Sequence, residues 1–157
     1  MEELIEELLK LFNENDIKYI IIGGMALPVY GYARATFDVD IFIEPTQENA
    51  KKTLKVLSQF GYKVIEDVKL KDFLNKKTLI RGYNLEIDIH PFVKGISFNE
   101  VWKNRVRTKI GSTFAYFSSL KDLIKMKKAA NRAKDKEDLK YLNKIKSMAI
   151  VHSDNRK

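Results

Sequence analysis

The chain has 157 residues, of which 45% are hydrophobic and 32% charged, and it contains no cysteine. This length suits one domain with a single hydrophobic core, and the lack of cysteine excludes disulfides and cysteine-ligated zinc. No apolar run is long enough to span a membrane, and the acidic start (residues 1 to 3) lacks the basic and apolar regions of a signal peptide. We therefore expect a single cytoplasmic domain over residues 1 to 157, without a membrane partner.

Charge is distributed unevenly along the chain. Residues 1 to 100 hold 13 Lys and Arg against 16 Asp and Glu, whereas residues 101 to 157 hold 16 against 5, for a total of +8. A basic region of this kind attracts nucleotides or nucleic acid through its long-range field. The other interpretation is a solvated, lysine-rich helical surface, because no aromatic residues alternate with the basic ones as stacking platforms would.

Hydrophobic periodicity predicts alternating helices and strands in the first part of the chain. Thr46 is a typical helix N-cap and Gly61 a typical helix end. The expected elements are a helix over 2–15, a strand over 17–22, a short helix over 25–32, a strand over 38–43, a helix over 46–60 and a strand over 62–66.

The second part continues the mixture of strands and helices. Residues 67 to 77 show no clear pattern, whereas 78–82 and 85–89 predict a hairpin, and 107–118 predicts a second one. Ser119 with Asp122, and Asp135 with Asp138, have the spacing of capping boxes that open helices. We expect an α+β (α/β) fold with a mixed sheet flanked by helices, in which residues 1 to about 118 form the core and about 119 to 150 form basic C-terminal helices.

Two aspartates with one residue between them begin the strand over 38–43. On a strand, Asp38 and Asp40 point the same way, roughly 6 to 7 Å apart, while Val39 and Ile41 point into the core. Aspartates at strand ends are commonly turn formers, but aspartate is depleted within strands, and like charges repel at this distance. A divalent cation relieves that repulsion, and Mg²⁺ is usually held by carboxylates together with substrate phosphates.

Two further segments carry residues that suit a phosphate or metal site beside Asp38 and Asp40. Gly23 and Gly24 follow a β-type run, and a turn without Cβ atoms brings backbone N–H groups close to a triphosphate. In the strand over 85–89, apolar residues alternate with Glu86, Asp88 and His90, so one face is polar. Asp88 lies at the middle of this polar face. Glu86 and His90 share its face, either as further ligands or as solvated side chains.

The order of strand, Gly-Gly, short helix and Asp-x-Asp strand resembles the nucleotidyltransferase superfamily that includes DNA polymerase β. The stretch from Gly23 to Asp40 is similar to minimal, stand-alone members with the pattern GG…RxTxDxD. These include relatives of toxins in abortive-infection toxin–antitoxin pairs and small-molecule resistance enzymes. The resemblance implies a nucleotidyltransferase-like sheet with two Mg²⁺ ions, or Mn²⁺, bound at the catalytic acids. The residues implied are Asp38, Asp40 and Asp88 for metal and catalysis, and Gly23, Gly24, Arg34 and Thr36 for the nucleotide.

A second stretch, residues 122 to 139, is similar to the pattern DLIxxKxxAxRxKDxxDL that follows the catalytic core in these enzymes. The matching charged residues are Lys127, Arg132, Lys134, Asp135 and Asp138. Among them, Lys127 and Arg132 are implied to bind the triphosphate. Asp135 and Asp138 have either a functional role or a structural one as helix caps.

The expected function is metal-dependent transfer of a nucleoside monophosphate from an NTP to a hydroxyl acceptor, with release of pyrophosphate. The acceptor is expected to be RNA or protein in a toxin–antitoxin setting, or a small molecule. An antitoxin, another protein or a second copy of the chain would complete the acceptor site. The alternative is a non-catalytic nucleotide-binding module that acts in a protein complex.

Overall fold

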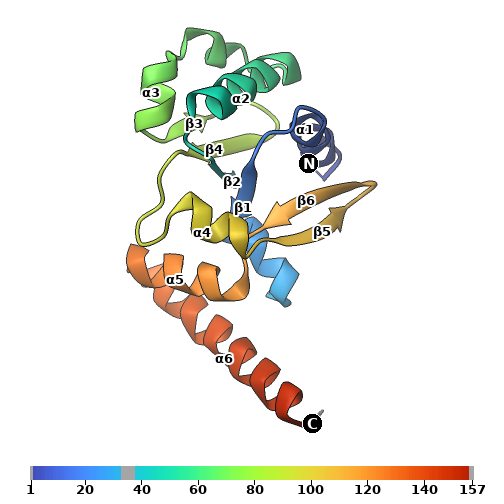
Figure 1. Cartoon of the computed structure of the whole chain (residues 1–157), viewed down its shortest axis with the longest axis vertical. Coiled ribbons are helices and arrows are strands. Elements are labelled where there is room, and N and C mark those ends of the chain that lie inside the picture. The colour runs from blue at the N-terminus through green and yellow to red at the C-terminus, as the bar shows by residue number, and fades with distance from the viewer. Residues whose placement is uncertain (1, 33–37, 156–157) are drawn as a thin grey trace.

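A six-stranded mixed sheet forms the centre of the computed structural model, which describes residues 2 to 32 and 38 to 155, with side chains as far as 148 (Figure 1). Strand β2 (Asp38–Ile43) is parallel to β4 (Glu86–His90) and antiparallel to β1 (Tyr19–Ile22), and β1 in turn is parallel to β6 (Thr113–Phe117). The fold is mixed α and β, as expected. In spatial order the strands are β3 (Thr78–Ile80), β4, β2, β1, β6 and β5 (Val106–Ile110).

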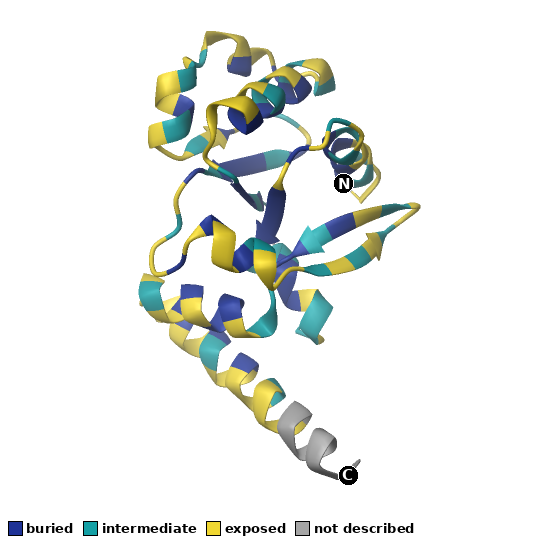
Figure 2. Cartoon of the chain, viewed as in Figure 1, coloured by how far each residue is buried: buried dark blue, intermediate teal, exposed yellow. Residues whose placement is uncertain are grey.

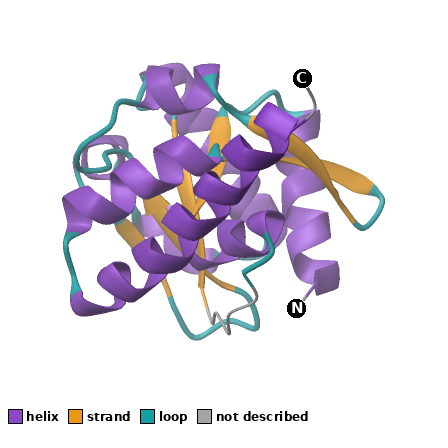
Figure 3. Cartoon of the chain, turned by 90° about the horizontal axis from the view of Figure 1, so that it is seen from below, coloured by secondary structure: helices purple, strands orange, loops and turns teal. Residues whose placement is uncertain are grey.

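Helices surround the strands, as the view from below shows (Figure 3). Thr46 caps α2 by accepting a hydrogen bond from the Asn49 N–H at 3.2 Å, and Gly61 ends it with a φ of 122°. Ser119 caps α5 in the same way, with the Asp122 N–H as donor at 3.1 Å. The helices are α1 (Glu2–Glu14), η1 (Gly23–Tyr30), α2 (Gln47–Phe60), η2 (Lys63–Asp67), α3 (Leu70–Asn75), α4 (Phe98–Lys103), α5 (Leu120–Ala130) and α6 (Ala133–Asn155).

The core lies along the central strands, which Figure 2 shows as buried. All residues of β1 are buried. In β2, Val39 is buried between the half-buried Asp38 and Asp40, and Ile41 to Ile43 are buried as well. The buried side of α1, which includes Leu8 and Phe12, packs toward β6. The sheet therefore places the apolar residues of β2 in the core and leaves its acids on a polar face.

Three expectations for local structure were wrong. The strand expected over 62–66 is instead η2 (Lys63–Asp67) with Tyr62 before it, because Tyr62 and Ile65, three residues apart, are buried together while Val64 is 41% exposed. The short helix after β1 is a 3₁₀ helix that begins at Gly23. Asp135 was expected to precede the last helix as its cap. Helix α6 begins at Ala133, so Asp135 lies inside its first turn.

Helix α6 extends away from the sheet toward the C-terminus, and its outer part is largely exposed (Figures 1 and 2). Its first turns are anchored through the buried Asp135, Asp138 and Leu142. None of the described helices has both the length and the apolar character that crossing a membrane requires.

Candidate active site

A cleft of about 560 Å³ lies where β2 and β4 approach the turn after β1, the loop after β4 and the corner between α5 and α6. Asp38, Asp40 and Asp88, the three acids expected from the sequence, all line this cleft, as does His90. Segments far apart in the sequence therefore contribute side chains to one concave site.

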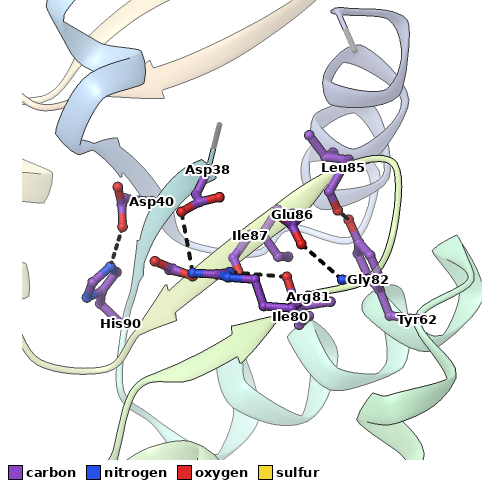
Figure 4. A network of polar contacts seen from close by, with 11 residues as sticks. Asp38, Asp40, Tyr62, Ile80, Arg81, Gly82, Leu85, Glu86, Ile87 and His90 are labelled. Atoms are coloured by element: carbon purple, nitrogen blue, oxygen red, sulfur yellow. Dashed lines mark hydrogen bonds and ion pairs between the residues drawn. The ribbon is translucent and has the colours of Figure 1, made fainter. Parts of the chain in front are cut away.

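The parallel pairing of β2 with β4 brings the acids together. Asp40 pairs in register with Asp88, and Asp38 pairs with Glu86. Directly paired residues on neighbouring strands point to the same face of a sheet. One side-chain ligand atom from each of Asp40, Asp88 and His90 lies within 4.8 Å of the other two. The His90 Nε2 atom is 2.8 Å from Asp40 Oδ1 (Figure 4).

The donor set of Asp40, Asp88 and His90 fits a divalent cation. Carboxylate oxygens suit Mg²⁺ and Mn²⁺, and imidazole nitrogen is a common ligand for transition metals. Asp88 Oδ1 is buried, and the positively charged group beside it in this structure is the guanidinium of Arg81.

Arg81, which the sequence reasoning missed, lies among the acids (Figure 4). Its Nη1 atom is 2.7 Å from Asp88 Oδ1, an ion pair without hydrogen-bond geometry, and its Nη2 atom is 3.4 Å from Asp38 Oδ2. The contact with Asp88 raises the pKa of the Arg81 guanidinium. Asp38 thus lies beside the arginine and outside the group formed by Asp40, Asp88 and His90. The only sequence signal for Arg81 is its place directly after β3 in the predicted hairpin.

Glu86 also lies beside Asp38 in the strand register, but its side chain has a local partner. Its Oε2 atom accepts a hydrogen bond from the Gly82 N–H at 2.9 Å (Figure 4). Glu86 therefore stabilises the turn between β3 and β4 and does not belong to the three-residue ligand group.

The glycines after β1 lie against the acids. Gly23 has a φ of +70°, and a Cβ atom at this position would lie 2.5 Å from Asp40 Oδ2. Only glycine both adopts this conformation without strain and leaves room for the carboxylate. Gly23 and Gly24 both line the cleft, so the Gly-Gly turn contacts the acid site directly.

A buried ion cluster closes the cleft on the side of α5 and α6. The ammonium group of Lys127 is 3.3 Å from Asp135 Oδ1 and 3.1 Å from Asp138 Oδ2. Arg132 donates to Asp135 from its backbone N–H at 3.0 Å and from Nε at 2.7 Å. Burial alone would raise the pKa of Asp135, but the hydrogen bonds from Arg132 and the charge of Lys127 lower it to about 2.

The ion cluster distinguishes Lys127 from Arg132, the two residues of this segment that were predicted to bind the triphosphate. Lys127 lines the cleft, but its charge is already balanced by two buried carboxylates. Arg132 also lines the cleft, and its side chain is 57% exposed. Arg34 and Thr36, the other two predicted nucleotide ligands, lie outside the described residues.

These features define a class of protein: an α+β domain with carboxylates in register on two parallel strands, a tight glycine turn against them and basic residues around the cleft. The chain belongs to a family described as nucleotidyltransferase of unknown function (DUF6036), whose model matches residues 1–152. No curated protein matches the chain.

Proposed function

We propose that the protein is a metal-dependent nucleotidyltransferase that moves a nucleoside monophosphate from an NTP to a hydroxyl acceptor. The observation that carries this proposal is the register of Asp40 with Asp88 on neighbouring parallel strands, with His90 completing a cation-binding group. Membership of a nucleotidyltransferase family supports the same reaction class.

In this reaction the acceptor oxygen attacks the α-phosphorus, the bond between the α-phosphorus and the bridging oxygen breaks, and pyrophosphate leaves. We assign Asp88 to accept the proton of the acceptor hydroxyl, and Asp38 and Asp40 to hold Mg²⁺ or Mn²⁺ together with Asp88. Bound cations would neutralise the phosphate oxygens and favour ionisation of the acceptor hydroxyl. The Nε2 atom of His90, 2.8 Å from Asp40 Oδ1, is the third ligand atom of the group that it forms with Asp40 and Asp88.

The triphosphate would lie between the Gly-Gly turn and the corner of α5 and α6. Gly23 and Gly24 offer close backbone approach. Arg132 donates from Nε and Nη2 to Asp135, and the partly exposed guanidinium keeps further N–H donors, on Nη1, for phosphate oxygens. We assign Lys127 a smaller part in binding the triphosphate, because Asp135 and Asp138 already balance its charge. Arg34 and Thr36 complete the proposed nucleotide ligands.

We propose RNA or protein as acceptor, within a toxin–antitoxin pair, with a small molecule as the alternative. The excess of positive charge in residues 101 to 157 supports a polyanionic acceptor. An antitoxin, another protein or a second copy of the chain would complete the acceptor site.

One observation favours a second candidate function, a non-catalytic nucleotide-binding module. Arg81 already neutralises Asp38 and Asp88, as in a site whose acids serve stability rather than metal binding.

Label transfer tests the two candidates against each other. The purified protein is incubated with Mg²⁺ and each α-labelled NTP, with cellular RNA and protein as acceptors, beside the Asp40→Asn variant. The enzyme is expected to label an acceptor and release pyrophosphate, and the variant is expected to do neither. Nucleotide binding without label transfer to any acceptor would support the binding module instead.

A further inference from the structure

The cleft has two chemically different halves. One half holds the acids, His90, Arg132 and Lys134. The other half is lined by α5 and by the loop after β4, which bring apolar side chains together with Lys94 and Lys127. The apolar lining residues are Phe92, Val93, Leu123, Met126 and Ala130. A ligand that matches this cleft has a charged end and a flat apolar end.

Phe92 is the most unusual residue of the apolar half. It lies two residues beyond His90 and is 74% exposed, more than any other large hydrophobic side chain in the described part of the chain. Other exposed rings are covered: Tyr141 stacks on Tyr32 at 4.4 Å, and the Arg107 guanidinium lies 3.7 Å from the Phe114 ring centroid. Among the described residues, Phe92 has no ring or cation partner of this kind.

The loop that carries Phe92 is held firmly in place. Pro91 is buried, and Val93 forms a β-bridge with Ile96. Gly95, with a φ of +90°, lies so close to α5 that a Cβ atom would be 2.6 Å from the Ala129 Cβ. Because its neighbours are packed and paired, the ring is held at the rim of the cleft.

We propose that Phe92 is the stacking platform for a nucleobase, with Val93, Met126 and Ala130 as the apolar wall beneath it. This inference rests on the proposed function, because the acid half would hold the phosphates of the same nucleotide. Aromatic rings stack on every base through its π-face. The ring of Phe92 and the wall beneath it are apolar, so this surface selects by stacking area and binds purines more tightly than pyrimidines. Lys94, exposed beside Phe92 and lining the same cleft, supplies positive charge at the rim.

Calorimetry with three probes in the presence of Mn²⁺ tests the platform. The probes are the α,β-methylene analogue of ATP, which cannot transfer its nucleotide, inorganic triphosphate, which has no base, and a short oligoadenylate RNA. Phe92→Ala is expected to weaken binding of the ATP analogue about tenfold or more, the usual scale for a lost stacking partner, without affecting inorganic triphosphate. Phe92→Leu, which keeps apolar bulk but has no aromatic face, should show most of the same loss.

Phe114→Ala is the matched control, since it removes an exposed phenylalanine on the β5–β6 hairpin, and it should bind every probe like the wild type. Weaker binding of the ATP analogue assigns the platform to the donor base, and weaker binding of the oligoadenylate alone assigns it to a base of the acceptor. Unchanged binding of both by a folded Phe92→Ala variant overturns the inference. A wild-type protein that binds the analogue but never transfers label overturns the proposed function instead.

Discussion

Arg81 Nη1 lies 2.7 Å from Asp88 Oδ1, so the carboxylate that we propose as proton acceptor already has a cationic neighbour. The same guanidinium reaches Asp38 at 3.4 Å. A divalent cation that binds Asp88 therefore competes with Arg81, and the arginine provides the charge balance of the acids when no cation is bound.

Replacing Arg81 should make the acid group bind cations more tightly. We expect Arg81→Gln to raise the affinity for Mn²⁺, measured by calorimetry without nucleotide, by up to about fivefold, because a partly exposed ion pair contributes about 1 kcal/mol or less. Arg105→Gln, which alters an arginine stacked on Trp102, should leave the affinity unchanged. Weaker Mn²⁺ binding by Arg81→Gln would show that the arginine supports the ligand group rather than competing with the cation.

Asp88 should matter to the chemical step more than to nucleotide binding. We expect Asp88→Asn to reduce single-turnover transfer by about 10²-fold or more, the usual scale for a lost general base, with little change in NTP affinity. The amide has nearly the same shape, so the variant should fold. Glu86→Gln is the control from the same strand face and should transfer at nearly the wild-type rate, because Glu86 hydrogen-bonds to Gly82. Unchanged transfer in Asp88→Asn would remove this residue from the mechanism.

Gly23 should be far less tolerant of substitution than Gly31, although both have positive φ. At Gly31, a Cβ atom would meet nothing within 4 Å, so Gly31→Ala should lower the free energy of unfolding by only about 1 to 2 kcal/mol. Gly23→Ala adds a clash with the Asp40 carboxylate, so it should cost more stability and also weaken Mn²⁺ binding. Equal Mn²⁺ affinity in the two variants would show that Asp40 does not need the space beside Gly23.

The Asp135 cluster should make stability depend on acid pH. The pKa of Asp135 is lowered to about 2 in the folded protein. A group of this kind stabilises the fold above the ordinary aspartate pKa, near 3.9, and its contribution disappears as the pH falls toward 2. From this group we expect a loss of about 2 kcal/mol in unfolding free energy between pH 5 and pH 2. Denaturant titrations should show a flatter pH dependence for Asp135→Asn, whereas Asp67→Asn, an exposed control, should behave like the wild type.

Lys127 should act mainly on stability. Removing its charge leaves Asp135 and Asp138 buried with one cation fewer, and breaking a buried ion pair usually costs about 3 to 5 kcal/mol. We therefore expect Lys127→Met to lower the unfolding free energy strongly. Arg132→Gln, which removes a partly exposed partner of Asp135, should lower it less and should also weaken binding of inorganic triphosphate. A stable Lys127→Met variant with weak triphosphate binding would reverse these two assignments.

Local sequence patterns predicted the elements whose signals are local. The bounds of β2 were predicted correctly because Asp38 starts a β-branched run, and α2 was predicted because Thr46 and Gly61 mark its ends. The strand expected over 62–66 was wrong because its burial depends on distant contacts, such as the hydrogen bond from the Tyr62 hydroxyl to the Leu85 carbonyl at 2.7 Å.

In the site, too, residues placed by their own strand were predicted, whereas contacts between distant segments were not. Alternation along the strands placed Asp38, Asp40 and Asp88 on polar faces, and the structure brings them into one cleft. The partners of these residues could not be predicted from the sequence. The contacts of Arg81 with Asp88 and of Lys127 with Asp138 depend on how the hairpin and the two C-terminal helices pack.

The parallel register of β2 with β4 also has a consequence for folding. Asp40 and Asp88 meet only after the chain between them, which includes α2 and α3, has folded back, and such long-range pairings form more slowly than hairpins. A chain in which β2 and β4 have not yet paired therefore has no assembled acid group, and any activity of the cleft begins only after this pairing has formed. A ligand that binds this group stabilises the folded state over the unfolded chain, since the unfolded chain offers it no site.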